Sequence, residues 1–138
     1  YGFTIESIGV TAQSEVTQAV DTLIKKGVDC FSNLTDNNVV GVLSSILEKT
    51  NEAGIPVYGS EVEQVKLGCV ASAGIEYFEL GRQTGAMAAK ILKGEATAEE
   101  MPYETVTGFN YYVNSEAIAE LGLTVPEAIA DSAIESAE

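Results

Sequence analysis

The chain has 138 residues, enough for one ordinary domain or one large lobe with a buried core. It carries 21 acidic residues against seven basic ones, a net charge of −14. This balance argues against nucleic acid and anionic membranes as partners, because both require clustered Lys and Arg. The chain has no histidine, which removes the commonest general base, the commonest metal ligand and any Ser–His or Cys–His nucleophile pair.

Two cysteines, Cys30 and Cys69, are too few for a disulfide scaffold or a four-cysteine zinc site. Each lies in a short apolar run, so we expect two buried thiols on strands. We expect neither a metal nor a cofactor. The chain begins at Tyr1 rather than Met, which suggests a processed protein or an excised fragment, and no apolar run approaches the ~20 residues of a membrane helix.

The first half of the chain alternates between strand and helix patterns. Residues 3–8 alternate apolar with polar side chains, which predicts a strand, and residues 13–26 carry apolar side chains at helical spacing. Ser14 is the expected N-cap of that helix, and Gly27 its stop. The predicted elements that follow are a strand at 28–31, a polar loop at 32–38, a helix from 39 to 54 and a strand at 55–58.

The second half continues the alternation. Its predicted elements are a helical turn at 61–67, a strand at 69–71 broken by Gly74, a long helix at 77–93, a strand-like stretch at 103–113, a short helix at 114–121 and a weak helix at 126–136. Such an order predicts an α/β fold, a mostly parallel sheet with helices on both faces.

Ligands of open parallel α/β sheets bind beyond the carboxyl ends of the strands. Three predicted loops occupy that position and are rich in hydrogen-bonding groups: residues 32–38, 59–63 and 72–77. In the first loop, Asp36 is expected to accept from an ammonium or hydroxyl group. Thr35, Asn37 and the free N–H groups that open the next helix would meet a carboxylate. The alternative is that Thr35 or Asp36 only caps that helix.

The other two loops repeat this pattern with fewer polar groups. Ser60 is expected to cap the turn that follows, and Glu61 is either a second polar contact or a favourable charge at a helix start. Glu76 and Tyr77 form an acid–aromatic pair before the long helix. Tyr77 would pack against an apolar ligand face, or else serve only in packing between elements.

The sequence motifs of several enzyme classes are missing. No G-x-G-x-x-G follows a strand, and neither a G-x-x-x-x-G-K-[ST] phosphate loop nor a G-x-S-x-G nucleophile elbow is present. Carboxylates are plentiful, but no pair is marked out as an acid and a base. A small flavodoxin-like enzyme is therefore the weakest hypothesis, and we expect the chain not to be an enzyme.

Five stretches, in the right order and over nearly the whole chain, resemble the bacterial ABC-transporter substrate-binding proteins whose characterised members take aromatic amino acids. The stretches are VDCFSNLTDNN (28–38), NEAGIPVYGS (51–60), VKLG (65–68), YFELGRQTGAMAAKILKG (77–94) and VNSEAIAELGLTVP (113–126). The resemblance implies a periplasmic-binding-protein fold of type I, in which two Rossmann-like lobes close on a solute.

The resemblance also implies that residues 1–138 are the second lobe without its first strand and helix. Residues 75–108 would then contribute to the missing first lobe or pack on it, with chain crossings near 74–76 and 108–109. Without that lobe, the apolar stripe of the long helix favours self-association. A signal peptide or lipobox would lie upstream of Tyr1.

By motif position, the resemblance places Asp36, Asn37, Ser60, Glu61 and Glu76 at the ligand site, with Tyr77 in the acid–tyrosine pair. Thr35 joins them as a polar group of the first loop. It implies an extracytoplasmic or lipid-anchored component of an ABC importer, which binds a small ligand such as an amino acid and works with a permease. Asp36 would hold the ammonium group. The alternative is the ligand-sensing effector domain of a transcription regulator, which shares this fold.

Overall fold

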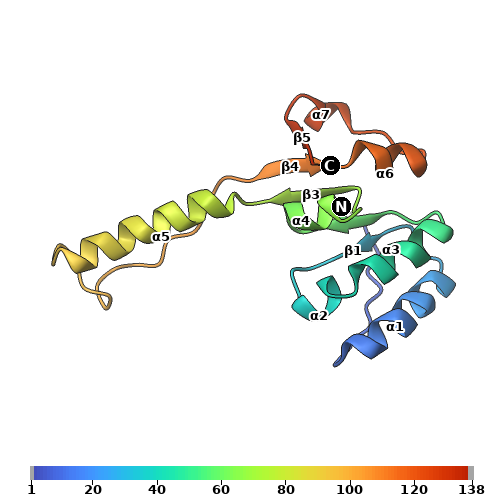
Figure 1. Ribbon diagram of the computed structural model, residues 1–138, viewed down its shortest axis with the longest axis horizontal. Coiled ribbons are helices and arrows are strands. Elements are labelled where there is room, and N and C mark those ends of the chain that lie inside the picture. The colour runs from blue at the N-terminus through green and yellow to red at the C-terminus, as the bar shows by residue number, and fades with distance from the viewer. Residues whose placement is uncertain (1, 137–138) are drawn as a thin grey trace.

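Five short strands form one sheet at the centre of the computed structural model, which describes residues 2–136. The strands lie in chain order: β1 (Phe31–Ser32), β2 (Val57–Gly59), β3 (Ala71–Gly74), β4 (Asn110–Val113) and β5 (Ala133–Glu135). Neighbouring strands are parallel except β3 and β4, which pair antiparallel. The predicted α/β fold with a mostly parallel sheet is therefore confirmed (Figure 1).

Helices cover both faces of the sheet. On one face, α1 (Gln13–Lys25) packs against α3 (Leu43–Glu52) over the main core. The members of this core are Val16, Val20, Leu43, Ile46, Leu47, Val57 and Cys69. Tyr58 follows Val57 on β2 and therefore points to the opposite face, where α6 (Ser115–Glu120) and α7 (Glu127–Ala130) border an apolar cavity.

The long helix α5 (Tyr77–Leu92) projects away from the sheet, and the chain returns beside it to β4 (Figure 1). The prediction of a helix at 77–93 is confirmed, but none of its residues is buried. Phe78 and Leu92 are 78% and 87% exposed. An amphipathic helix normally buries its apolar stripe against another element. No element of residues 2–136 covers the apolar side chains of α5 in this way.

The predicted strand at 3–8 is wrong. Residues 2–10 have no regular structure and are almost entirely exposed, since no described strand lies beside them to complete a hydrogen-bonded ladder. The predicted cap Ser14 is also wrong, because α1 begins after Ala12. There Glu15 reaches back to accept from the backbone N–H of Thr11 at 2.7 Å and from its hydroxyl at 3.1 Å.

Three further predictions differ from the structure. The helix expected from 39 to 54 is divided into α2 (Asn37–Val40) and α3, because Val42 leaves the helical region at φ −124°. Of the strand-like stretch 103–113, only β4 pairs in the sheet. The weak helix expected at 126–136 ends after α7, and the chain then pairs with β4 in parallel as β5.

Candidate functional site

The ends of β1, β2 and β3 lie along one edge of the sheet, because the parallel register aligns Ser32 with Tyr58 and Gly59 with Ser72. Side chains connect the loops at this edge. The Ser60 hydroxyl donates to the Asn33 carbonyl, and Gln64 Nε2 donates to the Leu34 carbonyl at 3.4 Å. The loops after β1 and β2 therefore form one continuous wall.

Gly59 makes the close packing at this wall possible. A Cβ atom at this position would lie 2.9 Å from Cβ of Gln64, which is fully buried on α4 (Val62–Lys66). Because no real Cβ sits that close to another carbon, any larger residue would push α4 away from β2. The absence of a side chain at Gly59 thus allows α4, which begins after Glu61, to pack closely against β2.

Asp36 is the N-cap of α2, as the capping alternative predicted. Its Oδ1 accepts from the backbone N–H groups of Asn38 at 2.9 Å and Val39 at 3.2 Å. The expectation of free N–H groups is therefore wrong for Asn38 and Val39, whose N–H groups donate to Asp36, while a contact from Thr35 or Asn37 to a ligand carboxylate stays a prediction. Oδ2 of Asp36 receives no hydrogen bond from residues 2–136. Thr35 and Asn37 lie exposed on either side of Asp36.

Glu61 caps α4 in the same way. Its Oε2 accepts from the Glu63 N–H at 3.2 Å, and its other oxygen has no donor within the described part of the chain. The expectation that Ser60 caps this turn is wrong, because its hydroxyl turns inward to the first loop instead. Ser60 therefore links the loop after β2 to the loop after β1.

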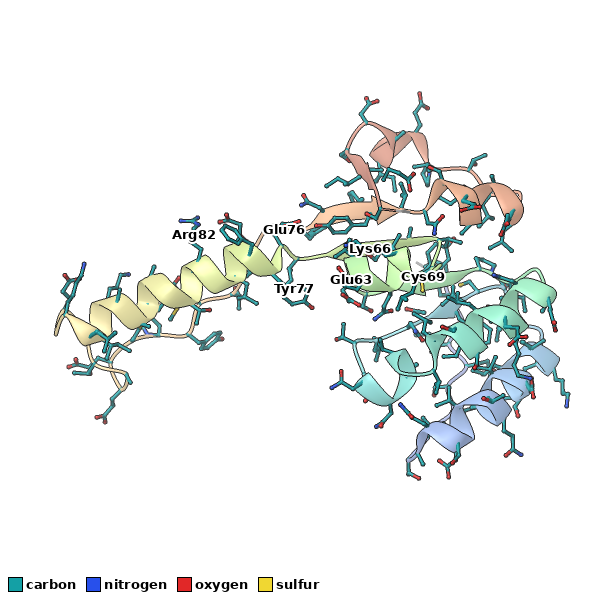
Figure 2. All side chains as sticks on the ribbon, in the orientation of Figure 1. Glu63, Lys66, Cys69, Glu76, Tyr77 and Arg82 are labelled. Atoms are coloured by element: carbon teal, nitrogen blue, oxygen red, sulfur yellow. The ribbon has the colours of Figure 1, made fainter. Side chains whose placement is uncertain are left out.

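Glu76 precedes α5 but does not cap it. Its Oε1 accepts from the hydroxyl of Tyr112, and Asn110 Nδ2 donates to the same oxygen at 3.4 Å. The hydrogen bond to Glu76, followed by burial, raises the pKa of Tyr112 above its ordinary value. Tyr77, 52% exposed, points away from β4 (Figure 2).

Asn110 and Tyr112 were absent from the sequence prediction. Both lie on β4, and the antiparallel register places Asn110 opposite Gly74, at the edge where β3 ends. The pattern of 103–113 predicted a strand but gave no sign of its neighbour. The antiparallel register of β3 and β4 is the information needed to place both residues at the site.

One arrangement recurs at the three strand ends. Asp36, Glu61 and Glu76 each use one carboxylate oxygen in a hydrogen bond within the chain, and the described residues leave the other oxygen without a donor. None of the three forms an ion pair with a Lys or Arg of residues 2–136. The edge therefore offers hydrogen-bond acceptors with uncompensated negative charge, which suits a cationic donor.

Other candidate groups contribute less. The prediction of two buried thiols on strands is wrong for Cys30, which is exposed and precedes β1. Cys69 is buried as predicted, but it lies just before β3 rather than on a strand. Burial, with a smaller effect from the charge of Glu61, raises the pKa of Cys69 to about 12.

Within residues 2–136, no group of three or more acidic or Cys side chains is placed to hold a metal ion.

Two cavities lie near the edge. A cavity of about 360 Å³ opens between the start of α5 and the returning chain at 105–110, and Glu76, Glu79 and Asn110 contribute to its lining. A second, apolar cavity of about 320 Å³ lies on the far face of the sheet beneath α6 and α7. Only the first is continuous with the predicted site residues.

A family model for ABC transporter substrate binding proteins matches residues 1–137. The chain belongs to this family. A curated relative, the "Tyrosine-binding protein" of Clostridioides difficile (strain R20291), is 30% identical over 115 residues, which are 83% of this chain and 33% of that protein. The family resemblance seen in the sequence is thus confirmed.

Solved structures agree with the family. The crystal structure of an ABC domain in complex with L-Trp from Streptococcus pneumonia matches with a TM-score of 0.84 and 28% identity, over 97% of this chain and 45% of that chain. The ligand-free, open structure of a substrate binding protein with adhesive properties from Clostridium difficile gives 0.73 and 32%, over 98% and 45%. This family member therefore spans less than half the length of each relative.

Two of the named relatives are described as binding proteins, and the third is described as an ABC domain in complex with L-Trp. None of the helices in residues 2–136 combines the length and the hydrophobicity of a membrane span.

Proposed function

We propose that residues 1–138 form part of the extracytoplasmic solute-binding component of an ABC importer, and that this component binds an amino acid with an aromatic or apolar side chain. Family membership supports the role in solute binding, and the descriptions of two relatives name tyrosine and L-Trp. The observation that carries the proposal is the row of three carboxylates, on Asp36, Glu61 and Glu76. Each has one oxygen in a hydrogen bond within the chain and one oxygen without a donor from residues 2–136.

The chemistry of this row matches the ammonium end of an amino acid. An ammonium group has three N–H donors and no acceptor, so it accommodates more than one carboxylate oxygen. Asp36 and Glu76 are the proposed charged contacts, with Thr35, Asn37, Ser60 and Glu61 beside them and the Tyr77 ring against the apolar side chain. The ligand carboxylate would be bound by the remainder of the longer protein, because the N–H groups that open α2 are occupied.

We also propose that the chain is the second of two lobes, without its first strand and helix, and that residues 75–108 pack on the first lobe. The unburied α5 supports this placement, as do the greater lengths of the relatives. Closure of two lobes on the solute would be favoured only by the extra ligand contacts of the closed state. In isolation, exposed Phe78 and Leu92 would favour self-association.

The family match favours this role over that of a regulator's effector domain. It also supports the proposed partner, a permease of the importer, and the proposed location on the outer side of the cell membrane, either free or held by a lipid anchor. No catalytic step is proposed, since binding and release of the solute are the whole function.

Calorimetric titration of the longer protein with the common L-amino acids tests the proposal. We expect binding of aromatic or apolar amino acids, and at least a tenfold weaker affinity for analogues that lack the ammonium group, because a hydrogen bond to a charged group is worth about 1.5–3 kcal/mol. If no amino acid binds, or if the amine-free acids bind equally well, the proposed function is refuted.

A further inference from the structure

The Glu76 carboxylate lies where the chain leaves the sheet for α5, and its two hydrogen-bond donors lie where the chain comes back. Gly74 and Asn110 are the last paired residues of β3 and β4. From β4, the hydroxyl of Tyr112 and the amide of Asn110 both reach Oε1 of Glu76. One carboxylate oxygen thus connects the two chain crossings.

The donors hold this carboxylate in a fixed direction. Tyr112 is only 5% exposed, and its ring packs over Gly74, where a Cβ atom would lie 3.4 Å from Cε2. Asn110 Nδ2 also lies 3.5 Å from the Tyr112 hydroxyl, so the three polar groups form one cluster. A glutamate held this way has already lost side-chain freedom, which lowers the entropic cost of binding a ligand.

Among residues 2–136, no Lys or Arg forms an ion pair with the carboxylate of this cluster. The arginine nearest in sequence, Arg82, pairs with Glu79 at 2.7 Å. Both donors to Glu76 are neutral groups, and Oε2 receives no donor from residues 2–136. A cationic donor supplied from outside the chain would complete the arrangement.

We propose that Asn110 and Tyr112 are positioning residues of the ligand site, which hold Glu76 with Oε2 directed at the ammonium group of the bound amino acid. The inference rests on the proposed function and deepens it. It assigns recognition of the ligand's ammonium group to the cluster of Glu76, Asn110 and Tyr112. The last two residues lie on β4, outside the three loops in which the sequence predicted ligand contacts.

The competing explanation is a purely structural brace between the two crossings. The two differ in their dependence on the ligand's charge. A positioning role acts through Glu76 and therefore affects only ligands that carry an ammonium group. A brace would change the affinity for every ligand alike, because it alters the shape of the site as a whole.

The experiment uses the longer protein and calorimetric titration with L-tryptophan and with indole-3-propionate, the same molecule without its ammonium group. L-Tyrosine and 3-(4-hydroxyphenyl)propionate form a second pair of probes. The variants are Tyr112→Phe and Glu76→Gln. The matched control is Tyr111→Phe, whose hydroxyl lies on the opposite face of β4 and whose ring contacts Phe109.

For Tyr112→Phe we expect the affinity for the amino acid to fall about three- to tenfold, as for one hydrogen bond, with no change for the amine-free acid. Glu76→Gln should cost tenfold or more, and Tyr111→Phe nothing. A double-mutant cycle provides a second measurement: Tyr112→Phe should have almost no effect in the Glu76→Gln background, because Tyr112 acts through that carboxylate.

Additive effects in the cycle overturn the proposal. So does a Tyr112→Phe variant that weakens both members of a probe pair equally, or that binds the amino acid as tightly as the unmodified protein. If the unmodified protein binds none of the common L-amino acids, the proposed function fails and this inference fails with it. That result is distinguishable because it appears before any substitution is made.

Discussion

Asp36 has two roles in our account, and two substitutions separate them. Its Oδ1 caps α2 through the N–H groups of Asn38 and Val39, and its free Oδ2 is the proposed contact to the ligand ammonium. Asp36→Asn keeps an oxygen for the cap but removes the charge, since Asn is about as good an N-cap as Asp. Asp36→Ala removes both. The pair of variants therefore tests recognition apart from folding.

The magnitudes make the test decisive. Loss of an N-cap costs about 1 kcal/mol, which lowers the melting temperature of a domain of this size by about 4 °C. Loss of the charge alone costs a few tenths of a kcal/mol at a helix start, or about 1 °C. Loss of a charged hydrogen bond to the ligand costs about 1.5–3 kcal/mol, which raises Kd about tenfold to a hundredfold.

Thermal unfolding without ligand and calorimetric titration with L-tryptophan or L-tyrosine supply the two measurements. We expect Asp36→Asn to melt close to the unmodified protein and yet bind at least tenfold more weakly. Asp36→Ala should lose both stability and most binding. If Asp36→Asn binds as tightly as the unmodified protein, Asp36 is a helix cap only, and the contact assigned to its Oδ2 is wrong.

Two further predictions concern the packing at Gly59 and the reactivity of the two cysteines. Gly59→Ala should lower the free energy of unfolding by about 1–3 kcal/mol in a denaturant titration, because its Cβ would lie 2.9 Å from Gln64. Gly81→Ala, in open space on α5, should instead leave stability equal or raised, and equal losses for both would contradict the packing argument. A thiol reagent at pH 8 should modify exposed Cys30 within minutes. Cys69, with its pKa raised to about 12, should react only on unfolding, and rapid labelling of both would contradict its burial.

The helices and the order of elements were predictable from the sequence because they depend on local patterns. The apolar spacing of 13–26 and 77–93 gave α1 and α5 to within a residue or two. The strand-end rule then brought Asp36, Ser60 and Glu61 to one edge, because parallel strands end on the same side. The capping role of Asp36 followed from its place before a helix.

Non-local pairing accounts for what the sequence did not predict. Residues 3–8 alternate like a strand, but a strand exists only where a neighbour completes its ladder. β5 is the converse case, because three residues without a strong pattern become a strand by pairing with β4. The roles of Asn110 and Tyr112 depend on the same kind of information, the antiparallel register of β3 and β4.

A capping role and the proposed binding role are compatible at the acidic residues of the strand ends, because each carboxylate has two oxygens. At Asp36 and Glu61 one oxygen caps a helix, and at Glu76 one oxygen accepts from two residues of β4. Neutral Asn or Gln would serve these bonds nearly as well. The charges themselves are therefore unnecessary for folding, and in a chain of net charge −14 they add repulsion. In the proposed site, a cationic ligand group at the second oxygens would supply the missing compensation. Our assignment of the site therefore depends on the oxygens that receive no donor from residues 2–136, more than on the acidic residues as such.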